Sequence, residues 1–182
     1  GGRRMEVICA RSAGFCFGVA RAVGMARELA RSAQSPRMLG SVIHNRRVTG
    51  ELEALGMGAL SSPEEAEPGD SVLLRAHGVG PRVYEVLAER GACAVDATCP
   101  KVARVQRLVR QAEEEGRQPV MIGDPDHPEV RGIGGWCRNL LVLSGPEAAA
   151  KWAQTAGASG EAVLTVVSQT TLRREIYEKT LK

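Results

Sequence analysis

Short runs of β-branched and aliphatic residues alternate along this chain with longer segments in which apolar residues recur every three or four positions. The short runs are typical of buried strands, and the longer segments are typical of helices with one apolar face. Regular alternation of strand and helix favours parallel sheets covered by helices. The pattern therefore predicts an α/β fold.

Seven apolar runs have the length and residue types expected of strands. They are residues 6–10, 37–43, 71–76, 92–98, 119–123, 140–144 and 162–168. Helical periodicity, or helix start signals, fill most of the intervals between them. The expected helices are 19–33, 48–55, a short turn at 62–65, 81–90, 102–112, 146–154 and a segment from 172 onward. The polar stretch 155–161 is expected to be a surface loop.

Glycine and proline mark several of the expected element ends. Gly56 and Gly116 follow apolar helical faces, where a left-handed C-terminal cap is expected. Pro63 follows Ser62, a combination that favours the start of a helix.

The strand and helix segments divide evenly on either side of Pro100. We therefore expect two similar small domains, each a parallel sheet flanked by helices, at residues 1–100 and 101–182. A chain of 182 residues is long enough for one domain or two small ones.

Composition narrows the possible functions. The chain is 43% hydrophobic and 25% charged, which is ordinary for a globular protein that buries a core. No apolar run approaches the roughly 20 residues that span a bilayer, so we expect a cytoplasmic protein with no membrane partner. The net charge is +3 and the basic residues are scattered, which gives nucleic-acid binding no support.

The five cysteines are an odd number at irregular spacing, which argues against a disulfide framework. Cys9, Cys93 and Cys137 are expected to behave as small buried hydrophobic residues. Cys16 and Cys99 differ, because Gly14, Gly18 and Pro100 surround them with turn signals.

Six reactive side chains follow the ends of predicted strands. They are Cys16, His44, His77, Cys99, His127 and Thr170. Ligands of open parallel sheets bind outside the carboxyl ends of the strands, where helix N-termini also attract anions. We therefore expect all six side chains to face one crevice.

The residue types indicate an anionic ligand and a metal. Three imidazoles, a carboxylate, hydroxyls and helix N-termini can surround a diphosphate, and two thiols suggest a metal centre. Other interpretations remain open at this point. A single histidine after a strand is often only a hydrogen-bonded loop residue. A zinc site usually contains closely spaced pairs of cysteine or histidine ligands, and this sequence has none. An iron–sulfur cluster normally takes four thiolates, which two cysteines do not supply. A dinucleotide site would need a complete glycine motif after a strand, and none occurs.

Six short motifs, in this order and at this spacing, resemble those of the 4-hydroxy-3-methylbut-2-enyl diphosphate reductases, the IspH or LytB family. The motifs are Gly14-Phe15-Cys16-Phe17-Gly18-Val19, Ile43-His44-Asn45, Ala76-His77-Gly78-Val79, Asp96-Ala97-Thr98-Cys99-Pro100, His127-Pro128-Glu129-Val130 and Gln169-Thr170-Thr171-Leu172. Each motif alone is weak, whereas six in register from residue 5 to about 175 make the resemblance specific.

The resemblance implies the last step of the non-mevalonate isoprenoid pathway. The allylic hydroxyl of the substrate is removed to give isopentenyl and dimethylallyl diphosphate, with electrons from a ferredoxin- or flavodoxin-type donor. In the family three cysteines hold a [4Fe-4S] cluster and leave one iron open, and Cys16 and Cys99 match two of them.

The resemblance also implies roles for the other residues. His44, His77 and His127 match residues around the substrate diphosphate. Glu129 matches the acid that supplies protons toward the departing hydroxyl, and Thr170 matches a hydroxyl in the same hydrogen-bond network.

The sequence departs from the family in what it lacks. A third α/β domain, the third cluster cysteine and a Ser-x-Asn segment are all missing, and the surroundings of Cys137 do not resemble the third-cysteine motif. We therefore expect a fragment that is inactive or nearly so alone. The alternative is a phosphate- or metal-binding α/β module without redox turnover.

Overall fold

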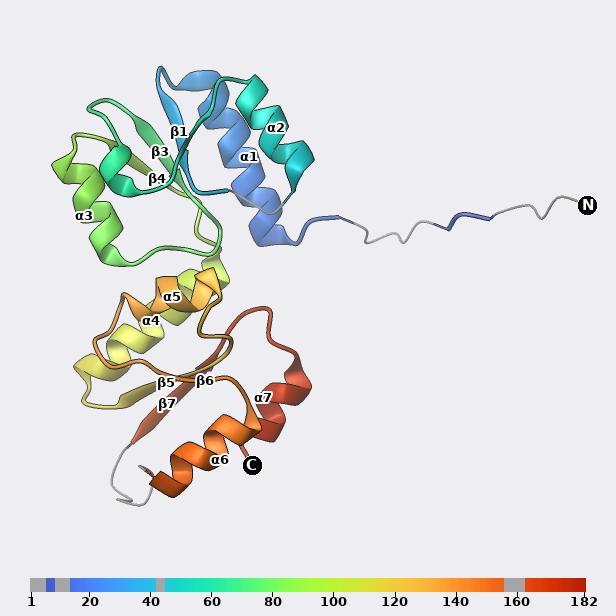
Figure 1. The fold of residues 1–182 in the computed structure, drawn as a ribbon, viewed down its shortest axis with the longest axis vertical. Helices are drawn as coiled ribbons and strands as arrows, with labels where there is room; N and C mark the ends of the chain where they lie inside the picture. The colour runs from blue at the N-terminus through green and yellow to red at the C-terminus, as the bar shows by residue number, and fades with distance from the viewer. Residues whose placement is uncertain (1–5, 9–13, 42–44, 156–162) are drawn as a thin grey trace, which may run out of the picture.

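The computed structural model describes residues 6–8, 14–41, 45–155 and 163–182. These residues form two parallel sheets with helices packed on them, and Figure 1 shows the two sheets in separate halves, with α5 and the start of α4 between them. The predicted α/β class is confirmed. The division into two domains near residue 100 stays a prediction.

The first half holds α1 (Phe17–Ser32), β1 (Pro36–Leu39), α2 (Arg46–Ala54), β2 (Gly58–Leu60), the short 3-10 helix η1 (Pro63–Glu65), β3 (Ser71–Leu74), α3 (Pro81–Glu89) and β4 (Cys93–Asp96). The second half holds α4 (Pro100–Glu114), β5 (Gln118–Ile122), α5 (Pro128–Gly134), β6 (Leu141–Leu143), α6 (Pro146–Thr155), β7 (Leu164–Ser168) and α7 (Arg174–Thr180).

Strand order reverses once in each sheet. The first sheet has the order β2-β1-β3-β4, so the chain moves from β1 outward to β2 and then returns to the other side of β1. The second sheet has the order β6-β5-β7 and reverses in the same way around β5. All the strand pairs are parallel. The reversals lie between β1 and β3 and between β5 and β7.

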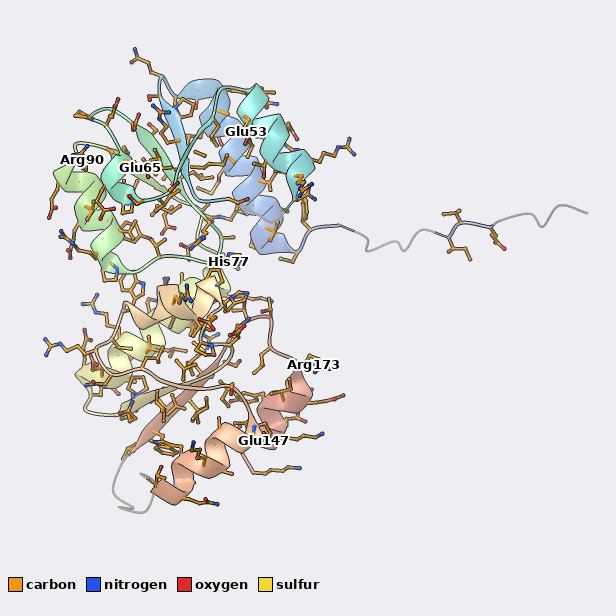
Figure 2. All side chains as sticks on the ribbon, in the orientation of Figure 1. Glu53, Glu65, His77, Arg90, Glu147 and Arg173 are labelled. Carbon is orange, nitrogen blue, oxygen red and sulfur yellow. The ribbon has the colours of Figure 1, made fainter. Side chains whose placement is uncertain are left out.

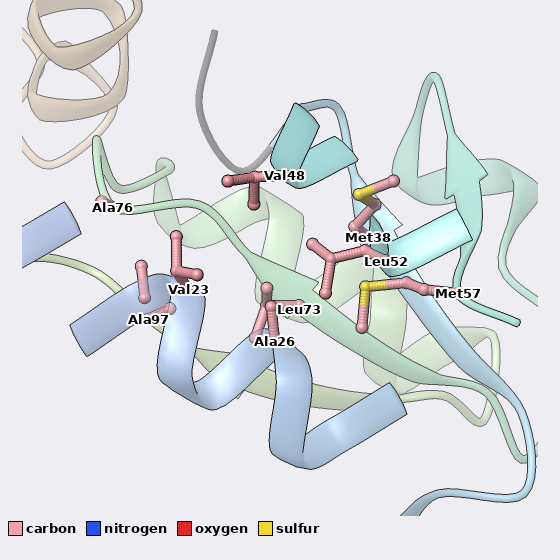
Figure 3. Packing of buried hydrophobic residues seen from close by; sticks show 10 residues of the cluster. Val23, Ala26, Met38, Val48, Leu52, Met57, Leu73, Ala76 and Ala97 are labelled. Atoms are coloured by element: carbon pink, nitrogen blue, oxygen red, sulfur yellow. The ribbon is translucent and has the colours of Figure 1, made fainter. Parts of the chain in front are cut away.

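Alternating side chains of the first sheet build two cores. Leu73 and Met38 face α1 and α2, where they pack with Val23, Ala26 and other buried residues (Figure 3). The intervening residues Val72 and Leu74 face η1 and α3. Successive strand residues therefore point to opposite faces of the sheet and pack against helices on both of them, as is usual for a parallel sheet.

In the second half, the apolar faces of α4 and α5 pack on β5 and β7. The buried residues of this cluster are Val102, Val109, Met121, Val130, Ile133 and Val167. Both predicted glycine caps are confirmed, because Gly56 and Gly116 have φ of +88° and +71°, in the left-handed region.

The strand predicted at residues 6–10 is wrong for the described residues 6–8, which lie apart from both sheets (Figure 1). The side chains of Val7 and Ile8 are 77% and 83% exposed. A β-branched run becomes a strand only where a neighbouring strand pairs with it, and these residues have no such neighbour among the described elements. Cys9 and the rest of the predicted strand lie outside the described residues.

Two elements escaped the sequence analysis. Strand β2 is short and begins at Gly58, so its strand pattern is weak, and it forms only because β1 lies beside it. Helix α5 contains Gly132 and Gly134, which weaken helical propensity, and it is held by packing of Val130 and Ile133. The predicted strand 37–43 also ends early, at Leu39, because Gly40 turns the chain with φ +67°.

Among the helices of the described residues, none is long and apolar enough to cross a membrane.

Candidate functional site at the strand ends

The predicted site residues lie mainly at the carboxyl ends of the parallel strands. His77 follows β3, Cys99 follows β4, His127 follows β5 and Thr170 follows β7. Cys16 precedes α1 but follows no strand among the described residues. His44 lies outside the described residues, so its predicted position stays a prediction.

The structure brings His77 and His127 together. Their ring centroids are 5.4 Å apart and the rings meet edge to face, at 84°. His77 belongs to the loop after β3 in the first half, and Figure 2 shows it at the junction of the two halves. The two imidazoles therefore come from different sheets and meet at one place.

Glycines build the contact that makes this meeting possible. A Cβ atom on Gly132 of α5 would lie 2.7 Å from the carbonyl oxygen of Gly78, and one on Gly135 would lie 2.8 Å from the Cα of Gly80. Such distances are too short for a side chain, so the two backbones approach closely because both sides lack one. The indole Nε1 of Trp136 also donates a hydrogen bond of 2.9 Å to the carbonyl oxygen of Val79.

Glu129 is a buried polar side chain of the site, and the exposed residue Thr170 holds it. The Glu129 side chain lies in the first turn of α5, and the residue is only 1% exposed. Its Oε1 accepts a hydrogen bond of 2.6 Å from the backbone N–H of Thr170, and its Oε2 accepts one of 2.7 Å from the Thr170 hydroxyl. A buried carboxylate costs free energy unless hydrogen bonds satisfy it, and Thr170 supplies two of them.

Hydrogen bonding also orients the His127 ring. The residue is the N-cap of α5, and its Nδ1 accepts a hydrogen bond of 3.1 Å from the backbone N–H of Glu129. Since Nδ1 acts as acceptor, the neutral ring carries its proton on Nε2. The Nε2–H of His127 is therefore the ring donor that can contact a ligand.

Gln169 is a buried residue of this site that sequence reasoning did not single out. Its Oε1 accepts a hydrogen bond of 3.0 Å from the backbone N–H of Asp124, and its Nε2 donates one of 2.7 Å to the Thr171 hydroxyl. The side chain thus joins the loop after β5, which leads to His127, to the loop that carries Thr170. Its signal in the sequence was its place in the motif Gln169-Thr170-Thr171-Leu172.

Cys16 and Cys99 cap neighbouring helices. Cys16 is the N-cap residue of α1 and Cys99 is the N-cap residue of α4. A Cβ atom on Gly18, in the first turn of α1, would lie 2.6 Å from the Cys99 sulfur. The Cys99 thiol therefore lies directly against the turn that Cys16 begins, and both sulfurs are near helix N-termini, which favour negative charge.

The other described cysteines are poorly suited to bind a metal at this place. Cys93 begins β4, at the opposite end of that strand from Cys99, and it is exposed, so the prediction that it is buried is wrong. Cys137 is half-buried beside the core of the second half; burial, assisted by the nearby Glu113 carboxylate, raises the pKa of its thiol to about 11. The raised pKa disfavours the thiolate form, which is the form that binds a metal.

Within the described ranges, no group of three or more histidine, cysteine, aspartate or glutamate side chains could hold a metal ion. The sulfur donors at the start of α1 and α4 are Cys16 and Cys99. The candidate site therefore has two parts, which are the two thiols and the polar group around Glu129.

Comparison with known proteins identifies the family. The sequence model described as LytB protein matches residues 7–182. The chain belongs to the LytB family. The resemblance drawn from the six motifs is thereby confirmed.

This LytB chain is 38% identical over 179 residues to the 4-hydroxy-3-methylbut-2-enyl diphosphate reductase of Clostridium perfringens (strain 13 / Type A). That match covers 97% of the chain and 61% of the relative. The reductase of the same name from Caldanaerobacter subterraneus subsp. tengcongensis is 39% identical over 144 residues, which are 76% of this chain and 50% of the relative. The LytB chain thus spans about half to three fifths of these relatives.

A solved structure of (E)-4-hydroxy-3-methyl-but-2-enyl diphosphate reductase, the terminal enzyme of the non-mevalonate pathway, superposes with a TM-score of 0.81 at 36% identity. It covers 96% of this LytB chain, which corresponds to 61% of the solved chain. The E-1-hydroxy-2-methyl-but-2-enyl-4-diphosphate reductase from Plasmodium falciparum shares the fold, with a TM-score of 0.86 at 24% identity over 94% of this chain and 53% of its own.

Proposed function

We propose that this LytB chain carries part of the active site of a 4-hydroxy-3-methylbut-2-enyl diphosphate reductase. The reaction removes the allylic hydroxyl and yields isopentenyl and dimethylallyl diphosphate. It takes two electrons and two protons, because one proton leaves with the hydroxyl as water and the other forms the new C–H bond. The names of the similar proteins support this substrate.

The observation that carries the proposal is the position of His127. Its ring lies against His77 from the first half, and its Nδ1 accepts a hydrogen bond from the N–H of the buried Glu129, which Thr170 holds. Anion-binding donors and a buried acid thus meet at the strand ends of both sheets. A substrate with a diphosphate at one end and a hydroxyl at the other needs both functions.

The diphosphate is bound by the imidazoles. His127 offers a ring N–H donor, since its Nδ1 accepts from the Glu129 backbone and the proton of the neutral ring is on Nε2. We assign the same role to His77, whose ring lies beside it. We assign His44 the same role from its motif.

Glu129 and Thr170 move a proton to the departing hydroxyl. When Glu129 is protonated, its carboxyl can donate to the Thr170 oxygen, which lies 2.7 Å away, while the Thr170 hydroxyl passes its own proton outward. Burial at 1% exposure keeps water from competing for the carboxyl. Glu129 thus acts as general acid, and Thr170 conducts the proton.

Cys16 and Cys99 would bind an iron–sulfur cluster of the [4Fe-4S] type. Their fit rests on the contact of the Cys99 sulfur with the Gly18 turn and on the two helix N-termini. Such a cluster, when bound, supplies electrons and a Lewis-acidic iron. Since the family uses three thiolates, this chain alone is expected to be inactive or nearly so. A ferredoxin- or flavodoxin-type donor and a cytoplasmic location belong to the same proposal.

Anaerobic reconstitution tests the function. The protein is expressed at the length its gene encodes, reconstituted with iron and sulfide, and assayed with the allylic diphosphate and a chemically reduced viologen dye. Formation of isopentenyl and dimethylallyl diphosphate is expected, and it should disappear in Glu129→Gln but persist in Glu147→Gln, a matched change on the exposed face of α6.

Two results would contradict the proposal. One is a reconstituted, folded protein that leaves the allylic diphosphate unchanged. The other is stoichiometric zinc with no cluster absorbance, which would favour a phosphate- or metal-binding module without redox turnover.

A further inference from the structure

Arg75 lies where the strand order of the first sheet reverses. Strands β1 and β3 are paired neighbours whose last partners are Leu39 and Leu74, so Gly40 and Arg75 are the next residues at the carboxyl ends. The reversal of strand order occurs between these two strands. In open α/β sheets, ligands bind in the crevice at such a reversal.

The Arg75 side chain extends across this point. A Cβ atom on Gly40 would lie 3.3 Å from the Arg75 Nη1, so the guanidinium lies over the backbone of the neighbouring strand end. Gly40 turns the chain with φ +67°, which few other residues adopt. The turn that starts at Arg75 also carries His77, because the Gly78 N–H donates a hydrogen bond of 3.0 Å to the Arg75 carbonyl oxygen.

The guanidinium of Arg75 has no partner within the described part of the chain. Its Nε is fully buried and makes no hydrogen bond, and no described carboxylate forms an ion pair with it. Burial lowers the pKa of Arg75, yet an arginine remains charged. A partly desolvated cation without a counter-charge is unfavourable, and a bound anion would remove that cost.

Arg37 gives a useful contrast in the same sheet. It lies on β1 near the opposite, amino-terminal end of the strands, where its Nε is 3.3 Å from the buried Asp70 carboxylate. The positive charge of Arg37 is therefore balanced by a carboxylate of the same chain. Arg75 at the carboxyl end lacks one.

We propose that Arg75 is a substrate-binding residue that contacts a diphosphate at the carboxyl ends of β1 and β3, where the strand order reverses. A guanidinium suits this ligand, because its planar N–H groups pair with two phosphate oxygens at once. The assignment rests on the proposed function, and it adds a permanently charged donor to the histidines. Its position beside the His77 turn makes it a specificity residue for the diphosphate end of the substrate.

The test is an isothermal calorimetric titration of this chain with inorganic diphosphate at fixed ionic strength. Arg75→Gln is expected to weaken binding about tenfold or more. Arg107→Gln removes the same charge from the exposed face of α4 and should bind within about twofold of the unchanged protein. Arg75→Lys, which keeps the charge but loses the paired donors, should fall between them.

A measurement on the unchanged protein covers the case in which Arg75→Gln does not fold. Nitrogen-15 NMR of the arginine Nε–H groups should show the Arg75 signal, assigned by its loss in Arg75→Lys, shifting as diphosphate is added. Equal affinity in Arg75→Gln and Arg107→Gln, or an Arg75 signal that does not move at saturating diphosphate, overturns the assignment. Binding of diphosphate through Arg75, combined with no reduction of the allylic substrate by the reconstituted protein at the length its gene encodes, would instead overturn the proposed function.

Discussion

Gly132 lets helix α5 approach the carbonyl oxygen of Gly78 so closely that a Cβ atom at position 132 would lie 2.7 Å from that oxygen. Gly78 follows His77 directly, and His127 caps the helix that contains Gly132. The distance between the two imidazoles is therefore set by a contact between two backbones. A rigid contact of this kind transmits any displacement directly to the site.

Gly132→Ala is expected to separate the two halves slightly. The added methyl must push the Gly78 backbone away, which should lower the free energy of unfolding by about 1–3 kcal/mol and weaken binding of inorganic diphosphate. Urea unfolding and calorimetry measure the two effects. Gly24→Ala is the control, because a Cβ atom at this exposed position on α1 meets nothing within 4 Å. Equal stability of the two variants would show that the Gly78 contact is not tight.

Gly18→Ala should disturb the Cys99 thiol. The new Cβ would lie 2.6 Å from the Cys99 sulfur, so the thiol must move from its place beside the first turn of α1. We expect a lower iron content after anaerobic reconstitution, comparable with Cys99→Ser, while Gly24→Ala in the same helix loads as the unchanged protein does. Normal iron content in both Gly18→Ala and Cys99→Ser would remove Cys99 from the cluster ligands.

Thr170 separates proton conduction from structure. Thr170→Val removes the hydroxyl that donates to Glu129 and should reduce turnover about 100-fold or more, with iron content unchanged. Thr170→Ser keeps the hydroxyl and the backbone hydrogen bond, and it should retain most of the activity. Single-turnover rates with the reduced, reconstituted protein make the comparison. If Thr170→Val turned over as fast as Thr170→Ser, the hydroxyl would have no part in the proton path.

Asp70 makes folding sensitive to acid. Burial works to raise the pKa of its carboxyl, but hydrogen bonds from the Glu67 N–H, the Ser35 hydroxyl and Arg37 outweigh burial and leave the pKa below its ordinary value. A lowered pKa in the folded state means that the carboxylate stabilises the fold above its ordinary pKa of about 4. This contribution is lost as the pH falls through the lower, folded-state pKa.

Asp70→Asn should therefore lower the free energy of unfolding by about 1–3 kcal/mol at pH 7. The difference from the unchanged protein should shrink as the pH falls below about 4, because the carboxyl of the unfolded chain takes up a proton first, and it should level off below the lower pKa of the folded state. Urea unfolding at pH 7, 5 and 3.5 gives the comparison, and Asp126→Asn serves as a control on an exposed loop. A constant difference across these pH values would contradict the role of the charge.

Much of the local structure could be predicted from residue patterns. The apolar faces of α1 and α4 and the turns at Gly56 and Gly116 depend on short stretches of chain, and each forms as expected. The strand expected at residues 6–10 did not form in its described part, since pairing with another strand cannot be read from one segment. Helix α5 was not predicted because its glycines have low helical propensity, and it forms because its apolar side chains pack in the core.

The sequence alone determined the α/β class, most of the helices and strands and the family motifs, because these depend on periodicity and on residue types within a few positions of each other. Only the tertiary structure decided that His77 meets His127, that Thr170 holds Glu129, and that Arg75 lies beside Gly40. These relationships join residues that are distant along the chain. They arise from strand order and from the close approach of side-chain-free backbones, and neither leaves a periodic signal in the sequence.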